Sequence, residues 1–295
     1  MSKKKRHGRR PAAAAKPRKQ SIEFVARPFA GLPAEEDLVA MAQIIPAATA
    51  TVRLTEEYGG GQVQLVTLLP EFVQGLKRSD GEVLVAMQTS MHSGDVSRDV
   101  AAAVLATLEL PEGQTLRADG LPEPGPRLQD ILDTSEPPAV SVRETFDFWV
   151  DPEAAGENEQ ARQVIEEAIE RAKDEIAPTR PVPGVEHAYW CRLGSKEFVR
   201  WVRGEDEDEF FNAFARIYAA RESDLEEGAR FVGAFRANGV AIPVWELVPG
   251  TEAEELTKPL QAMGKRLDAA LADESPLTPE VRRAKAGIIS RQVNL

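Results

Sequence analysis

The apolar residues of this chain occur in short segments separated by turn signals, and this pattern limits the folds that it can adopt. The longest segment covers residues 100–108 and is rich in alanine. A membrane-spanning helix needs about 20 apolar residues, so none is expected. Some segments have the spacing of an amphipathic helix, and others have the length and composition of strands. The chain is therefore expected to be a soluble α+β protein with no membrane partner.

The first half of the sequence predicts a small sheet with two helices. Three consecutive glycines, Gly59 to Gly61, form a flexible connection between two strand-like segments, and Asp80-Gly81 marks a tight turn before a third. The expected elements are a strand near Phe24, a helix at 35–45, strands at 49–54, 63–69 and 83–87, and a helix from Ser97 to Leu108.

The second half predicts the order strand, helix, strand, strand, helix, strand, which is that of the split-βαβ, ferredoxin-like fold. Asn238-Gly239 is its strongest turn signal, because both residues tolerate the positive φ of a tight hairpin. The first half has a looser version of this order, so a degenerate duplication is a further hypothesis. The expected elements are a strand at 146–150, a helix at 161–172, a hairpin of 188–193 and 197–202, a helix at 210–218, a hairpin of 231–235 and 240–248, and a final helix at 252–271.

The length of 295 residues suggests about two domains. Six prolines between residues 111 and 142 interrupt any long element, so this segment is predicted to connect them. The predicted organisation is a disordered basic tail at 1–21, an N-terminal α+β lobe at 22–110, a Pro-rich, partly ordered connection at 111–142, and a C-terminal α+β lobe with a final helix at 143–295.

Charge is divided between an N-terminal tail and the rest of the chain. The first 20 residues contain nine basic and no acidic residues, whereas residues 21–295 hold 27 basic and 48 acidic residues, a net charge of −21. A basic tail favours electrostatic contact with RNA, DNA, a ribosome or an acidic protein partner. The tail lacks aromatic residues for base stacking, so a solvated tail without a specific partner is the alternative. The basic residues are Lys3, Lys4, Lys5, Arg6, Arg9, Arg10, Lys16, Arg18 and Lys19.

Cys191 is the only cysteine, which excludes an internal disulfide and a zinc site of several thiolates. No apolar run follows the basic start, so we expect no secretory signal and predict a cytoplasmic protein. His187 precedes Cys191 by four residues, about 13 Å along a strand, so the two cannot form a nucleophilic pair there. His7 or His92 would have to supply the base. A buried structural cysteine beside Trp190 is the favoured interpretation.

Residues 92–99 run from a strand end into a helix N-terminus, where backbone N–H groups can hold an anion. Ser93, Ser97 and Arg98 are the candidate anion- or ligand-binding residues. A nucleophilic serine would also need a histidine and an orienting acid, which this spacing does not establish. A turn followed by a helix cap at Ser97 is the alternative that we favour.

Other chemistry-bearing residues are interpreted as structural. Trp149, Trp190, Trp201 and Trp245 are predicted in strands of the second half, where core packing is favoured over stacking on a base or peptide. The acidic run 205–209 lacks the glycine and spaced ligands of an EF-hand loop and suits a helix N-terminus. No metal or cofactor is therefore expected.

A set of short blocks from Arg27 to the C-terminus carries a family resemblance. The blocks are Arg27–Pro33, Gly125–Asp130, Ala188–Cys191, Val199–Val202, Phe231–Ala237, Pro243–Trp245 and Ser290–Val293. They resemble an actinobacterial family of unknown function, some members of which have an N-terminal SEC-C zinc motif and are labelled SecA-like. The basic tail contains no cysteine, so the zinc function is not carried over. No Gly-rich loop ending in Gly-Lys-Ser/Thr occurs, so a nucleotide-driven motor is not expected.

The leading hypothesis is a cytoplasmic, non-enzymatic binding or adaptor protein whose basic tail contacts a nucleic acid, a ribosome or an acidic partner. The alternative is a small-molecule sensor or an enzyme, with a site near Ser93–Asp99 or between the lobes. A scaffold whose tail only aids solubility is the third option. The sequence contains no recognisable catalytic or nucleotide-binding motif.

Overall fold

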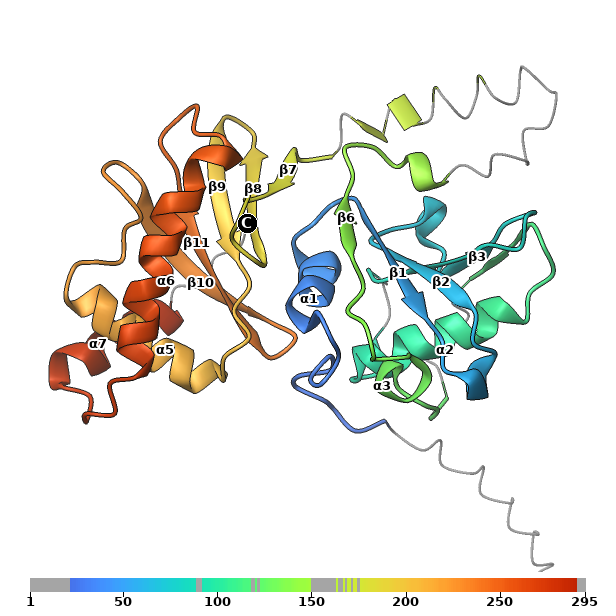
Figure 1. Cartoon of the computed structure of the whole chain (residues 1–295), viewed down its shortest axis with the longest axis horizontal. Coiled ribbons are helices and arrows are strands. Elements are labelled where there is room, and N and C mark those ends of the chain that lie inside the picture. Colours follow the sequence, from blue (N-terminus) through green and yellow to red (C-terminus); the bar gives the residue numbers. More distant parts are fainter. Residues whose placement is uncertain are drawn as a thin grey trace, which may run out of the picture.

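The computed structural model describes residues 22–88, 92–117, 120, 123–149, 163, 167, 169–170, 172–173 and 176–290. Its helices and strands confirm the α+β class, and they are arranged around two separate sheets (Figure 1). No helix in these ranges is both long enough and apolar enough to cross a bilayer.

The first sheet is mixed and has the strand order β5-β3-β4-β2-β1-β6. Adjacent strands in this sheet run antiparallel, except β2 and β4, which run parallel. Both edge strands, β5 and β6, come from the proline-rich segment 111–142, so this segment contributes to the sheet. The strands are β1 (Ala48–Arg53), β2 (Gln62–Val66), β3 (Gly75–Lys77), β4 (Val83–Ala86), β5 (Gln114–Leu116) and β6 (Val140–Val142).

Helices α1 (Glu35–Gln43), α2 (Val96–Leu108) and α3 (Leu128–Ile131) pack around the first sheet. The 3₁₀-helices in this part are η1 (Glu56–Tyr58), η2 (Pro70–Phe72) and η3 (Asp147–Trp149). The predicted helices at 35–45 and 97–108 and the strands at 49–54, 63–69 and 83–87 are confirmed within a few residues.

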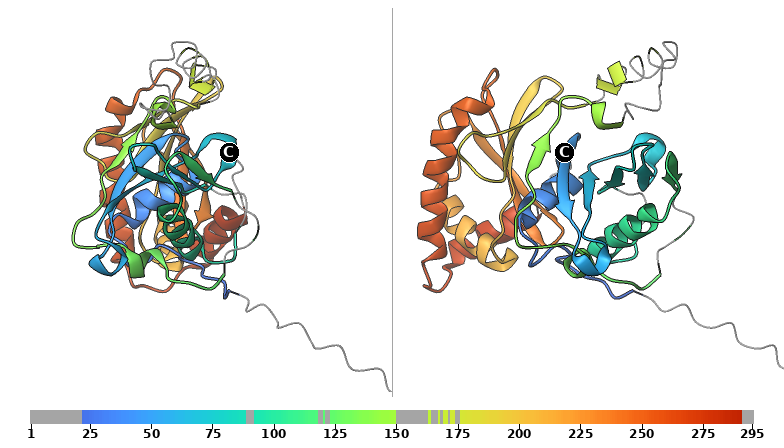
Figure 2. Two further views of the ribbon diagram at one scale, coloured as in Figure 1. Left: turned by 90° about the vertical axis from the view of Figure 1, so that its right-hand side faces the viewer. Right: turned by 45° about the vertical axis from the view of Figure 1, so that its right-hand side comes forward.

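The second sheet is antiparallel throughout and has the order β10-β11-β9-β8-β7. Helices α5, α6 and α7 cover the face that points away from the first sheet (Figures 1 and 2). Its elements are β7 (Thr179–Pro181), β8 (Ala188–Leu193), β9 (Lys196–Trp201), α5 (Glu207–Ala219), β10 (Arg230–Ala237), β11 (Val240–Glu246), η4 (Ala253–Leu256), α6 (Thr257–Leu271) and α7 (Pro279–Ser290).

The ferredoxin-like prediction for the second half is wrong in its details. The expected strand at 146–150 forms η3 instead, because its aromatic side chains gather on one side. Phe146 stacks on Trp149 with ring centroids 4.1 Å apart, and the Trp149 indole N–H donates to the Leu68 carbonyl of the first half. Successive strands β7, β8 and β9 then pair directly as a meander. The expected helix at 161–172 falls largely outside the described residues.

Two further sequence predictions are also wrong. A duplication is not supported, because the first sheet contains a parallel pair and the second contains none among its described strands. The segment near Phe24 forms no strand. Within the described part of the chain, it is held by a backbone hydrogen bond from the Val25 N–H to the Gly94 carbonyl. The short helix α7 was not predicted from the sequence.

Helix α1 lies between the two sheets, and its buried side chains contact both (Figures 1 and 2). Leu38 and Met41 are almost fully buried and belong to one apolar cluster with Val52 of β1 and Tyr189 and Ile242 of the second sheet. Burying each such side chain stabilises the fold by about 1.5–3 kcal/mol. The helix therefore holds the sheets in a fixed relation and positions the polar groups between them.

Candidate functional site

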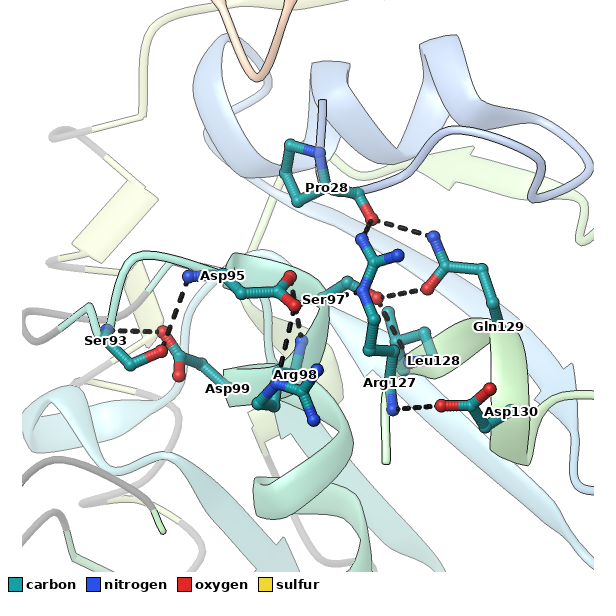
Figure 3. Close-up of polar contacts among 10 residues, drawn as sticks. All are labelled: Pro28, Ser93, Asp95, Ser97, Arg98, Asp99, Arg127, Leu128, Gln129 and Asp130. Carbon is teal, nitrogen blue, oxygen red and sulfur yellow. Dashed lines mark hydrogen bonds and ion pairs between the residues drawn. The ribbon is translucent and has the colours of Figure 1, made fainter. Parts of the chain in front are cut away.

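The residues predicted to bind an anion lie at the N-terminus of α2 (Figure 3). The helix begins at Val96, and Asp95, rather than Ser97, caps it by accepting a hydrogen bond from the Arg98 N–H. Ser97 is fully buried in the first turn, where its hydroxyl donates to Gln129 at 2.6 Å. The cap prediction was wrong by two residues, because aspartate and serine are equally good caps.

The carboxylate of Asp95 occupies the helix N-terminus that an external anion would need. It is completely buried, and its Oδ2 atom lies 2.9 Å from Nε of Arg127 and 3.5 Å from Nε of Arg98 (Figure 3). The Ser93 N–H donates to the Asp99 carboxylate at 2.8 Å. Of the three predicted residues, only Arg98 presents a charged side chain with part of its surface exposed.

Arg98 and Arg127 line an open groove together with the start of the described chain. The other lining residues are 22–26, Asp95 and Pro124, and we call this site the arginine groove. The chain is held there because the Val25 N–H donates to the Gly94 carbonyl at 2.8 Å. Two guanidinium groups share one buried carboxylate. Glu23 also lines the groove, so its two basic and two acidic side chains balance in formal charge.

The predicted basic tail lies outside the described residues, but the point where it joins the body is described. The Phe24 side chain is 76% exposed at the arginine groove. The residues that follow the predicted tail, from Ile22 onward, therefore lie beside Arg98 at this groove. Arg127 and Phe24 carried no sequence signal that linked them to Arg98, since Arg127 is about thirty residues away and Phe24 about seventy.

A second polar site lies between the sheets, where the sequence analysis allowed a site between the lobes but named no residues for it. His187 comes just before β8, and its Nδ1 lies 2.8 Å from Oδ1 of Asp37 on α1. The Tyr189 hydroxyl donates to the same Oδ1 at 2.7 Å. His187 has a φ of 58°, which non-glycine residues seldom adopt. No local pattern could pair His187 with an aspartate 150 residues away.

The Asp37 cluster shifts the protonation of all three residues. The hydrogen bond to Asp37 raises the pKa of His187, and partial burial opposes this only in part. Burial alone would raise the pKa of Asp37, but the hydrogen bonds from His187 and Tyr189 together lower it. Burial raises the pKa of Tyr189 strongly, and the Asp37 charge adds to the shift. Asp37 is therefore an anion and Tyr189 a neutral hydroxyl near neutral pH.

His187 lines an open pocket between α1 and the end of β9, which we call the intersheet pocket. Its acidic residues are Glu36, Glu186 and Glu205. Arg203 pairs with Glu205 and places its guanidinium 4.2 Å from the centre of the Trp201 ring. The lining contains no serine, threonine or cysteine, so His187 has no neighbouring nucleophile to activate. The chemistry available here is binding or proton exchange.

Cys191 is buried, as the structural interpretation required. Burial raises the pKa of its thiol, and the hydrogen-bonded Arg200 guanidinium counteracts only part of that effect. His187 pairs with Asp37 rather than with Cys191. Of the two candidate bases, His7 lies outside the described residues, and His92 lies between β4 and α2 in the first half, whereas Cys191 lies in β8 of the second sheet. Cys191 is therefore not an activated nucleophile.

The remaining candidates are structural. Trp190, Trp201 and Trp245 are buried in the core beneath α5 and α6, whereas Trp149 lies in η3 rather than in a strand. In the acidic run, Asp206 caps α5 by accepting hydrogen bonds from two backbone N–H groups. Within the described part of the chain, no group of three His, Cys, Asp or Glu side chains is placed to hold a metal ion.

These features define a two-sheet α+β protein with an arginine groove beside α2 and an acidic pocket between its sheets. Residues 28–295 match the model described as "Family of unknown function (DUF5926)", and the chain belongs to this family. No curated protein and no solved structure matches the chain. The resemblance to a family of unknown function is thereby confirmed, and it supplies no reaction or ligand.

Proposed function

We propose that this protein is a non-enzymatic binding or adaptor protein whose basic N-terminal tail contacts a polyanion, with RNA as the first choice and DNA or a ribosome as alternatives. The observation that carries the proposal is the charge division: nine basic and no acidic residues in the first 20, against a net −21 over the rest. An acidic body repels nucleic acid, so affinity must come from a basic segment.

The arginine groove supports this proposal at the base of the tail. Arg98 and Arg127 add basic groups beside the residues that follow the tail, and Phe24 provides the aromatic ring that the tail itself lacks. Aromatic side chains stack on bases and guanidinium groups contact phosphates, so the groove extends the tail as a binding surface. Cytoplasmic location and membership of an actinobacterial group are parts of the same proposal.

The experiment is a salt series with fluorescent poly(U) of about 20 nucleotides and duplex DNA of equal length. Three proteins are compared: the full chain, a variant without residues 2–20, and a variant with all nine tail cations changed to glutamine. The full chain is expected to lose about 10³-fold in affinity between about 50 and 200 mM salt, and both variants are expected to bind weakly with a flat salt response.

A matched control changes two exposed lysines of α6, Lys258→Gln and Lys265→Gln, and is expected to bind as the full chain does. Equal affinity of the full chain and the glutamine variant at low salt would refute the tail's role. Preferential binding of duplex DNA would replace RNA as the polyanion.

The intersheet pocket favours a second candidate function, a small-molecule sensor. The specific observation is that His187, held in an uncommon backbone conformation by Asp37, lines an open polar pocket. Its test is a fragment screen monitored by the NMR signals of the His187 ring. The comparison variant is Glu186→Gln, which alters the pocket wall and is expected to weaken fragment binding.

A further inference from the structure

The segment that joins α3 to β6 runs beside β1 and encloses a pocket. Residues 133–139, which we call the proline strap, contain two consecutive prolines and no helix or strand (Figure 1). The strap is fixed to β1 at both ends. The Asp133 N–H donates to the Arg53 carbonyl at 2.8 Å, and the pairing of β6 with β1 begins at Val140. The pocket that the strap lines, the strap pocket, has a volume of about 300 Å³.

The deep end of the strap pocket is apolar. Four aliphatic side chains line it although they are almost fully buried, so they form its floor. They are Leu32, Leu38, Val52 and Leu132. The polar residues of the lining are all partly or fully exposed, so they lie toward the mouth. Water at the floor finds few hydrogen-bond partners, and an apolar group that displaces this water therefore binds favourably.

Helix α1 keeps this floor in place. Leu38 follows Asp37, which is hydrogen-bonded to the His187 ring and to the Tyr189 hydroxyl. These contacts hold the first turn of α1 against the second sheet. The four floor residues belong to the same apolar cluster as Tyr189, so both sheets support them. The pocket is therefore formed before a ligand enters, which reduces the ordering cost of binding.

The charges at the mouth of the strap pocket favour a cation over an anion. Hydrogen bonds from Ser135 lower the pKa of Asp133, and the charge of Arg53 lowers it further. Asp133 is therefore an anion near neutral pH, and its charge and that of Arg53 offset each other. Glu136, which is exposed, is the remaining charged residue of the lining. Residues 21–295 carry a net charge of −21, which also attracts cations.

We propose that the strap pocket binds a small amphiphilic amine, with its apolar part on the floor and its ammonium group at the mouth beside Glu136. An apolar cavity of about 150 Å³ can hold benzene, so a pocket of about 300 Å³ accommodates an alkyl chain of about eight to ten carbon atoms. The strap pocket shares no lining residue with the arginine groove or the intersheet pocket. The proposal is therefore independent of the basic tail and of polyanion binding.

The test uses the full chain with labelled leucine methyl groups and the probes butylamine, hexylamine and octylamine. Saturable shifts are expected for the methyl signals of Leu38 and Leu132, but not for those of Leu267, which is buried in the other cluster beneath α6. The affinity is expected to rise about fourfold for each added CH₂ group, because each group is buried on the floor. Octanoate has a similar chain with the opposite charge and is expected to bind about tenfold more weakly than octylamine.

A variant that fills the strap pocket tests the location of the site. Ala139→Phe adds a ring at an exposed position of the lining and is expected to weaken octylamine binding at least about tenfold. The matched control is Ala269→Phe at an exposed position of α6, which is expected to bind as the wild type does. If Ala139→Phe does not fold, the probe series on the wild type decides.

Three results would each overturn the proposal. The first is the absence of saturable shifts at Leu38 and Leu132. The second is an affinity that does not depend on chain length, or octanoate binding as tight as that of octylamine. The third is unchanged octylamine binding by folded Ala139→Phe.

Discussion

Asp37 on α1 accepts a hydrogen bond from His187, 150 residues further along the chain, with Oδ1 and Nδ1 2.8 Å apart. Both side chains are about three-quarters buried. The pair joins the helix between the sheets to the first residues of β8, next to the apolar cluster that Leu38 and Tyr189 share. Because both members titrate, this junction makes the stability of the fold depend on pH.

The first prediction concerns that pH dependence. The pKa of His187 is raised from 6.5, so its contribution to stability is complete below about pH 6.5 and is lost as the pH rises through the raised value. The pKa of Asp37 is lowered from 3.8, so its contribution is lost only as the pH falls through the lowered value. The melting temperature is expected to fall between about pH 6 and pH 9. His187→Asn, which tolerates positive φ, should remove this decline. An unchanged decline in that variant would contradict the assignment.

Tyr189→Phe tests the second hydrogen bond to Asp37. The hydroxyl donates to a charged acceptor in a buried position, so its removal is expected to cost about 1.5–3 kcal/mol in the free energy of unfolding. The pKa of Asp37 is expected to rise at the same time. Urea unfolding measures the first effect, and a carboxyl NMR titration measures the second. Tyr58→Phe, at a partly exposed ring in η1, is the control and should change neither.

Gly239→Ala tests how the start of the chain packs on the second sheet. Gly239 has a φ of +79°, and an added Cβ would lie 2.6 Å from the Cβ of Arg27 and 2.7 Å from the Ala26 carbonyl oxygen. Gly250 has a similar φ of +88° with no atom near its Cβ position, so Gly250→Ala carries the backbone strain alone. Thermal unfolding is expected to show a larger loss for Gly239→Ala by at least about 1 kcal/mol. Equal losses would mean that the contact with Arg27 is of no consequence.

The hairpins and amphipathic helices were predictable because their signals are local. Asn238-Gly239 forces a tight turn, and the alternating residues on either side of it pair as β10 and β11. The spacing of Phe210, Phe214 and Ile217 likewise defines the buried face of α5. Each of these signals lies within a few residues of the structure that it specifies, so tertiary packing has little to override.

The order of the strands and the intersheet pocket could not be predicted, because they depend on contacts that are distant in sequence. The segment at 146–150 has the composition of a strand, yet Phe146 and Trp149 stack and bury against the first sheet. Asp37 resembles any acidic residue in the first turn of a helix, and only the fold brings it to His187. Both cases are decided by tertiary packing rather than by local preference.

Cys191 and Arg200 give a prediction about a buried charge. Arg200 is 8% exposed, and its guanidinium contacts the thiol of Cys191 rather than a carboxylate. Burial lowers its pKa, which reflects the cost of the desolvated charge. Arg200→Met is therefore expected to leave stability unchanged or to raise it by about 1–4 kcal/mol in urea unfolding. Arg203→Met, which loses its pair with Glu205, is the control and should destabilise the protein.

Asp95→Asn tests the arginine groove. Asparagine keeps the helix cap but removes the charge that Arg98 and Arg127 share, so the free energy of unfolding is expected to fall by about 2 kcal/mol. The released guanidinium groups are partly exposed and can contact phosphates, so the affinity for poly(U) should rise. The slope of log affinity against log salt should become steeper by the amount that corresponds to about one additional phosphate contact. The control is Asp99→Asn, a buried residue in the same turn that accepts the Ser93 N–H and has no arginine partner among the residues that the structure describes. This variant should leave the salt slope unchanged. Weaker poly(U) binding by folded Asp95→Asn would show that the groove does not face the polyanion.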